Sequence, residues 1–201
     1  MARISNLPRY IACGRVTKRP IFDFFHPSIR PGDSLVVFPL ADNYSFGILQ
    51  SRIHWSWFTE RCSTMKRDPR YTSETVFDFF PWPQSPKQKD AREVSRAAVA
   101  LCEVRAKILA EDNLCLREIY RLLELEGDNP LKEAHEDLDE AVRHAYGISP
   151  NQDVLAFLLA LNKELAVREA ESKSVVGPGL PCTVEDPDQL VTDYCIRPPR
   201  L

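Results

Sequence analysis

The sequence lacks any apolar run long enough to cross a membrane, and no apolar stretch follows its start. A membrane-spanning helix needs roughly 18 or more apolar residues in succession, and the opening Met1-Ala2-Arg3-Ile4-Ser5 does not lead into the apolar core of a signal peptide. With 44% hydrophobic and 27% charged residues over 201 positions, the composition is typical of a soluble globular protein. We therefore expect a cytoplasmic protein.

The cysteines form no metal-binding or disulfide pattern. There are six, and no two of them make a C-x-x-C pair. Such spacing indicates neither a zinc knuckle nor a disulfide framework. We expect reduced, mostly buried thiols.

Catalytic motifs are absent from the sequence. It contains no G-x-G-x-x-G, G-K-[ST], H-E-x-x-H or G-x-S-x-G. None of the four histidines has metal-ligand spacing to another or to a cysteine, and we expect His135 and His144 to be solvated on a helix. The acidic pair Asp137 and Asp139 is typical of a solubilising helix face. We predict no catalytic residues and no metal site in this chain.

Charge divides the chain after Gln84. Residues 1–84 hold 11 Lys and Arg against 7 Asp and Glu, a net charge of +4, whereas residues 85–201 hold 15 against 22, a net charge of −7. A basic module followed by an acidic one favours a polyanion partner for the first half. A difference of this size is also compatible with ordinary solvated faces.

The first half has the composition of a β-rich unit that carries one helix. Short runs rich in aromatic and β-branched residues, separated by turn residues, predict strands at 9–17, 20–25, 34–40 and 44–50. Helical spacing of apolar residues predicts an amphipathic helix over 51–65, followed by a basic loop at 66–71. Alternation then predicts a last strand over 72–80, which Pro81-Trp82-Pro83 ends.

The second half has helical periodicity. Apolar residues repeat every three to four positions from Lys87 onward, so we predict a long helix, a short helix over 114–125, a third helix that begins at Asn129-Pro130 and a fourth that reaches Glu171. Ser149 and Gln152 form a capping-box pattern before the fourth helix. The tail from residue 172 has no period and is expected to lie extended over another surface or to be disordered.

The motifs between Leu35 and Pro83 carry a family resemblance. Phe46-Gly47-Ile48-Leu49-Gln50-Ser51 and Phe80-Pro81-Trp82-Pro83 occur in the order and at the separation found in the target recognition domain of large fused DNA methyltransferases. The chain most resembles the MmeI-like type IIL restriction-modification enzymes. Ala145-Tyr146-Gly147 and residues 158–162 are similar to the helical C-terminal domain that follows in those enzymes.

The resemblance implies a role in adenine-N6 DNA methylation, often coupled to cleavage, by a parent enzyme. It also implies that S-adenosylmethionine binds elsewhere in that enzyme. The methyltransferase core of the family carries an Asn-Pro-Pro-aromatic motif that holds the flipped adenine; this chain departs from that pattern, because it has no such motif and Arg197-Pro198-Pro199-Arg200 does not replace it. The chain is then the specificity part of such an enzyme: a fragment, a split gene product or an isolated piece. Its partners are double-stranded DNA and a methyltransferase core on the same or a separate polypeptide.

Candidate DNA contacts follow from residue chemistry. Cations suited to phosphate contacts are Lys18, Arg19, Arg52, His54, Arg61 and Arg70. Lys66 and Asp68, two residues apart before Arg70-Tyr71, have the donor and acceptor that one G·C pair requires in the major groove. In the resembling family, a pair with this spacing helps to choose one base pair. The alternatives are ordinary surface charges and, for Lys66 with Asp68, an exposed local salt bridge; Trp57 and Trp82 are expected in the core.

These observations predict an α+β protein in three parts. Residues 1–84 form a DNA target recognition domain, 85–171 a helical C-terminal domain and 172–201 a tail. The function favoured is sequence-specific DNA recognition without independent catalysis. One alternative is a protein–protein interaction module in which the acidic helical half docks a partner; another is an enzyme whose site has no recognised motif.

Overall fold

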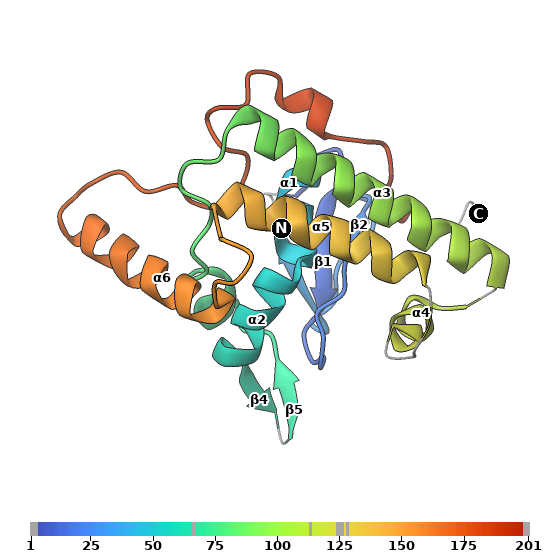
Figure 1. Cartoon of the computed structure of the whole chain (residues 1–201). Coiled ribbons are helices and arrows are strands. Elements are labelled where there is room, and N and C mark those ends of the chain that lie inside the picture. Colours follow the sequence, from blue (N-terminus) through green and yellow to red (C-terminus); the bar gives the residue numbers. More distant parts are fainter. Residues whose placement is uncertain (1–3, 66, 113, 124–126, 128, 199–201) are drawn as a thin grey trace.

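A small antiparallel sheet and a set of packed helices make up the chain, which is α+β as predicted (Figure 1). The computed structural model describes residues 4–65, 67–112, 114–123, 127 and 129–198. The sheet comprises β1 (Tyr10–Gly14), β2 (Phe22–Phe25) and β3 (Leu35–Phe38) in the order β2-β1-β3. The first three predicted strands are therefore confirmed, within shorter bounds.

The fourth predicted strand, 44–50, is wrong, because this segment is helix α1 (Asn43–Gln50). The Asp42 side chain caps the helix by accepting a hydrogen bond from the Ser45 backbone N–H at 2.6 Å. Every residue of α1 is buried, so the helix shows no polar face. A short apolar run of this kind cannot be told from a buried strand by its periodicity.

The predicted helix over 51–65 is shorter than expected. Helix α2 (Arg52–Arg61) ends at Cys62, and the chain then forms a hairpin of β4 (Ser63–Met65) and β5 (Asp68–Arg70) where a loop was expected. The strand predicted over 72–80 is also wrong. Residues Ser73–Phe77 form a π-helical turn, closed by the Asp78 N–H donating to the Ser73 carbonyl at 2.9 Å.

The four helices predicted in the second half are confirmed. They are α3 (Gln88–Asp112), α4 (Leu116–Leu122), α5 (Pro130–Tyr146) and α6 (Val154–Ala170). Asn129 caps α5, and Gly147 ends it with a left-handed φ of 70°. The cap of α6 is Asp153, which accepts from the Ala156 N–H at 2.7 Å, and not the predicted Ser149.

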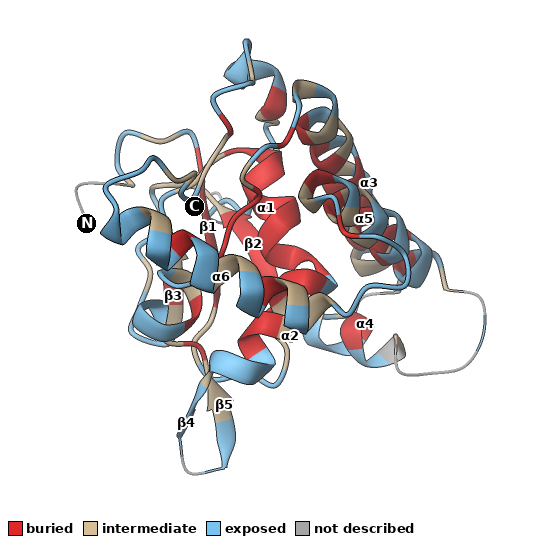
Figure 2. Cartoon of the chain, turned by 60° about the vertical axis from the view of Figure 1, so that its left-hand side comes forward, coloured by how far each residue is buried: buried red, intermediate tan, exposed pale blue. Residues whose placement is uncertain are grey.

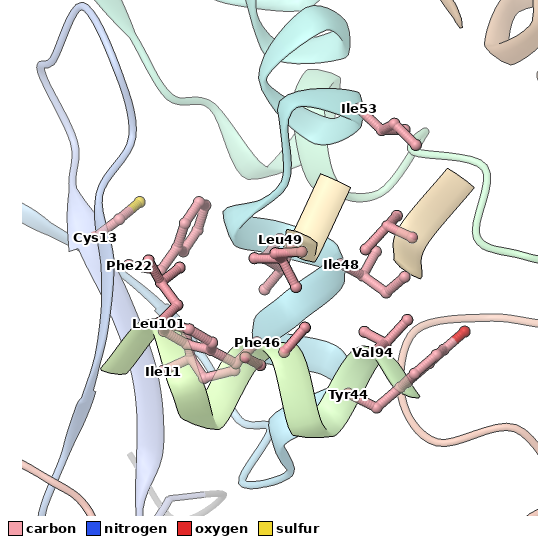
Figure 3. Close-up of a cluster of buried hydrophobic side chains, with 14 of the residues drawn as sticks. Ile11, Cys13, Phe22, Tyr44, Phe46, Ile48, Leu49, Ile53, Val94 and Leu101 are labelled. Atoms are coloured by element: carbon pink, nitrogen blue, oxygen red, sulfur yellow. The ribbon is translucent and has the colours of Figure 1, made fainter. Parts of the chain in front are cut away.

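One hydrophobic core joins the two halves. Helix α1 lies between the sheet and α3, and Figure 3 shows Ile11 and Phe22 of the sheet, Phe46 of α1 and Leu101 of α3 converging there. Helix α5 packs along α3 (Figure 1). The proposed boundary after Gln84 lies in the segment between the π-helical turn and α3, and the core continues across it. Trp57 and Trp82 are buried in this core, as predicted.

The tail is held against the sheet by the buried side chain of Arg9. Its guanidinium donates to the Tyr194 carbonyl at 2.8 Å and to the Thr192 hydroxyl at 2.9 Å, and it lies 3.5 Å from the centre of the Phe24 ring. Ile196 adds a parallel bridge to the edge of β2. A short 3-10 helix (Pro187–Leu190) precedes these contacts. The described part of the tail therefore lies over another surface of the protein, which is the first of the two outcomes expected for it.

All six cysteines are free. Cys13 and Cys102 are buried, but Cys115 and Cys182 are exposed, against expectation. Among the described residues, no helix is long and apolar enough to span a membrane.

Candidate nucleic-acid interface

The β4–β5 hairpin projects from the body of the protein (Figures 1 and 2). Its register pairs Met65 with Asp68 and Ser63 with Arg70. All of β4 is exposed, and so are Arg67 and Asp68. Two short antiparallel strands of this kind form a ribbon that a DNA major groove is wide enough to admit.

The base of the hairpin is fixed to the chain that leaves β1. Val16 forms an antiparallel bridge with Arg70, and the Thr17 N–H donates to the Pro69 carbonyl at 3.0 Å. The next residue, Tyr71, is buried and stacks on Phe58 of α2 with ring centres 5.6 Å apart. The hairpin therefore has a rigid base, although its tip is exposed.

One face of this ribbon combines charged and apolar side chains. Residues directly opposite each other in an antiparallel pair share a face, and residues two apart on one strand do as well. Met65 and Ser63 therefore share a face with Asp68 and Arg70, and the bridge adds Val16 beside Arg70. This side of the hairpin, consisting of Val16, Ser63, Met65, Asp68 and Arg70, is called the ribbon face below.

The predicted phosphate-binding cations fall into two groups. Arg61, exposed at the end of α2, lies 4.9 Å from the Trp57 ring, and α2 leads directly into β4. Arg70 is half-buried on the ribbon face, and Lys18 is exposed shortly after the Val16 bridge. These three cations are near the hairpin by chain position.

Arg19 and Arg52 form the second group, at the junction with the helical half. The Arg19 guanidinium lies over the rings of Trp55 and Tyr120, at 4.8 and 5.3 Å from their centres. Arg52 begins α2, at the end of that helix opposite to Arg61. The structure therefore does not bring all the predicted cations to one place.

The side chain of Asp139, on α5, is hydrogen-bonded to the N-terminus of α2. Its carboxylate accepts a hydrogen bond from the Arg52 backbone N–H at 2.6 Å. Burial raises the pKa of Asp139 to about 6, although this hydrogen bond and the Arg52 charge oppose the rise. Its expected role as a solubilising charge is wrong, because the carboxylate joins the two halves of the chain.

His54 is not on the surface, so its predicted phosphate contact is incompatible with this structure. The ring is fully buried, packs edge-on against Phe22 and Phe80, and its Nε2 lies 3.0 Å from the Tyr71 hydroxyl. Burial lowers the pKa of His54 to about 3. The imidazole is therefore neutral and belongs to the core.

His135 was expected to be solvated, and this is wrong. It is buried between α5 and α4, where its Nε2 lies 2.9 Å from the Tyr120 hydroxyl. Burial, together with the charges of Arg19 and Arg105, lowers its pKa to about 3. His144 is exposed beside Glu140, as expected.

Of the two predicted base-reading residues, Lys66 lies outside the described residues. Asp68 is exposed on the ribbon face. The sequence did not single out Val16 and Met65, which occupy the same face. Their apolar side chains were assigned to a strand and to the apolar stripe of a helix, and only the pairing register identifies their common surface.

Among the described residues, no group of three or more His, Cys, Asp or Glu side chains could hold a metal ion. With the carboxylate of Asp68, the guanidinium of Arg70 and the apolar side chains of Val16 and Met65, the ribbon face can donate and accept hydrogen bonds and make apolar contacts. These are the interactions that base edges in the major groove offer.

Comparisons with known proteins support the resemblance seen in the sequence. Residues 17–84 match the family model described as "MmeI, target recognition domain". DNA methyltransferase A of Bacillus subtilis (strain 168) is 31% identical over 132 residues, which cover 64% of this chain and 14% of that protein.

A solved structure has the same fold. It is the type IIL restriction-modification enzyme MmeI in complex with DNA, which superposes with a TM-score of 0.71 at 22% identity, over 81% of this chain and 22% of that chain. The likeness shows that the fold continues beyond residue 84 into the helices. The chain spans only 14% and 22% of the two relatives.

Proposed function

We propose that this chain is the DNA-reading part of an adenine-N6 DNA methyltransferase of the restriction-modification type, because residues 17–84 match the family model described as "MmeI, target recognition domain". Its partners are double-stranded DNA and a methyltransferase core, on the same or a separate polypeptide. Such an enzyme acts in the bacterial cytoplasm as part of a defence against foreign DNA, and a nuclease can accompany the methyltransferase.

The observation that carries this proposal is the projecting β4–β5 hairpin with its ribbon face. A two-stranded ribbon fits the major groove, where each base pair presents its own pattern of donors, acceptors and methyl groups. The ribbon face offers a carboxylate in Asp68, a guanidinium in Arg70 and apolar surface in Met65. Lys66 and Asp68 remain the proposed readers of one G·C pair.

Phosphate contacts come from cations near the hairpin. Arg61 is held over the Trp57 ring, which limits the conformations of its long side chain before DNA binds. Lys18 and Arg70 complete this group, while Arg19 and Arg52 are candidates for contacts made from the side of the helical half. Phosphate contacts position the protein and do not distinguish sequences.

Catalysis is proposed to reside outside this chain. S-adenosylmethionine would supply the methyl group in the parent enzyme, and the Asn-Pro-Pro-aromatic motif that holds the flipped adenine in such enzymes is missing from this chain. Asn129-Pro130, the Asn-Pro pair of the sequence, is followed by Leu131, and the Asn129 side chain caps α5 by accepting from the Leu131 N–H at 2.9 Å.

Salt dependence of DNA binding tests the proposal. A protein that displaces counterions from phosphates loses affinity linearly in log Kd against log salt concentration. We expect this behaviour for the full chain with a labelled duplex, measured by fluorescence anisotropy between about 50 and 200 mM salt. Arg61→Ala should reduce the slope by about 0.9, the value for one phosphate contact, and should do so equally for duplexes of different sequence.

Lys163→Ala is the matched control, because Lys163 is an exposed cation on α6. It should leave the slope unchanged. Affinity that does not respond to salt, or the same slope for the Arg61 and Lys163 variants, would contradict the proposed interface.

A further inference from the structure

The ribbon face carries two of the six large apolar side chains that are exposed in the described part of the chain. Met65 is 46% exposed and Val16 is 45% exposed. Neither belongs to the core cluster or to the partly buried residues packed against it. Neither side chain is therefore part of the hydrophobic core.

The position of Met65 is set by its pairing with Asp68. The two residues lie directly opposite each other at the end of the hairpin, so their side chains emerge on the same face. Val16 lies farther down the same face, beside Arg70 at the fixed base. The acceptor Asp68 and the donor Arg70 are thus accompanied on this face by an apolar side chain at each end of the hairpin, Met65 and Val16.

Apolar side chains have a defined target in the major groove. The C5-methyl group of thymine is the apolar element that base pairs present there, and side chains that contact it distinguish thymine from cytosine. Methionine suits this contact because its unbranched thioether side chain adapts to the surface it meets.

We propose that Met65 contacts the C5-methyl group of a thymine next to the base edge that Asp68 faces, and thereby selects an A·T pair at that position. This inference rests on the proposed function, because it requires the ribbon face to enter the major groove. It adds base reading by apolar contact, through Met65, to the base reading by hydrogen bonding that is proposed for Asp68. Val16, at the base, is farther from the exposed end, and we assign it no role in base reading.

Replacement of thymine by uracil tests the proposal, because it removes only the C5-methyl group. The full chain is used to select bound duplexes from a random pool, and the enriched duplex is then made with each thymine replaced by uracil in turn. One replacement should weaken wild-type binding about fourfold, the equivalent of about 0.8 kcal/mol for one buried methyl group. Met65→Ala should bind the thymine and uracil forms of that duplex equally.

Thr64→Ala is the control on the same strand. Thr64 is exposed and pairs with Pro69 on the opposite face of the ribbon, so this variant should keep the wild-type preference for thymine. Met65→Leu, which keeps an apolar side chain of similar size, should keep most of it.

The outcomes separate the two proposals. An enriched duplex that contains no thymine, tolerates uracil at every position, or still distinguishes thymine after Met65→Ala overturns the role of Met65 alone. A pool without any enriched sequence contradicts sequence-specific recognition by this chain, and the role of Met65 with it.

Discussion

Two buried histidines, each beside a tyrosine hydroxyl, are the most informative single residues in the chain. His54 meets Tyr71 in the first half, and His135 meets Tyr120 in the second. Neither pair can be predicted from sequence, because the partners are 17 and 15 residues apart and a histidine on an apolar helix face shows no partner by itself. Sequence reasoning placed both imidazoles in solvent for this reason.

The neutral state of His54 predicts a pH dependence of stability. Its folded pKa of about 3 is below the unfolded value of about 6.5, so on acidification only the unfolded chain takes up the proton. Its contribution to stability is therefore complete above pH 6.5 and is lost as pH falls below that value. When the pH is lowered from 7.5 to 5.0, the free energy of unfolding of His54→Phe should fall by about 2 kcal/mol less than that of the wild type.

Urea unfolding at the two pH values measures this difference. Comparison with the wild type is needed because burial raises the pKa of Asp139 and Asp23, which makes acid favour the folded state at those groups. The variant should be less stable at pH 7.5, since the Tyr71 hydroxyl loses its partner. His144→Ala, at an exposed position, should follow the wild type; equal losses in all three proteins would show that His54 is not buried and neutral.

At the scale of elements, sequence reasoning succeeded where periodicity extends over several turns. Helices α3, α5 and α6 are long enough to show it, and the Asn129 and Gly147 signals mark both ends of α5. It failed for α1 and for residues 73–77, which are short and rich in residues that also suit strands. The hairpin was missed because each of its strands is only three residues long, and the bridge that fixes its base comes from the distant Val16.

Gly47 shows why α1 can lie so close to α3 and α5. A Cβ atom at this position would be 2.7 Å from Val94 Cγ1, 3.3 Å from the Val94 carbonyl oxygen and 3.2 Å from Leu138 Cδ1. Gly47→Ala gains about 1 kcal/mol of helix propensity, but the overlap forces the helices apart. We expect a net destabilisation of about 1–3 kcal/mol in urea or thermal unfolding.

A control and a rescue make this prediction specific. Gly14→Ala should change stability little, because a Cβ there meets nothing within 4 Å. Val94→Ala removes the atom in closest conflict, so adding it to Gly47→Ala should cost less than the two single changes together. If Gly47→Ala is as stable as the wild type, the close approach of α1 to α3 is not tight.

For the whole molecule, the charge boundary and the structural unit do not coincide. The sign of the net charge changes after Gln84. Contacts nevertheless join the two sides of this boundary, because α1 packs on α3 and the carboxylate of Asp139 accepts a hydrogen bond from the N-terminus of α2. The buried Arg105 of α3 also donates to the Phe22 carbonyl of β2 at 2.8 Å. Composition records which surfaces are charged, whereas these contacts depend on three-dimensional packing. The helical half therefore supports the ribbon face by holding α2 and the sheet in place.

This continuity predicts that the chain stays folded after its backbone is cut near Gln84. A protease site inserted between Ser85 and Pro86 lies outside the helices and strands and next to the exposed Ser85. Pro86 itself is buried and accepts a hydrogen bond from the Thr183 hydroxyl, but the core contacts on both sides of the insertion should keep the chain folded. The cut chain should elute as a single species of the full mass in size-exclusion chromatography and unfold in one transition, because the core holds both pieces. The fragments should separate only in denaturant, and residues 1–84 expressed alone should give no cooperative unfolding, since α1 would lose the α3 surface that covers it. Two pieces that separate in buffer and each unfold cooperatively would instead establish two independent domains, with the ribbon face supported by the first half alone.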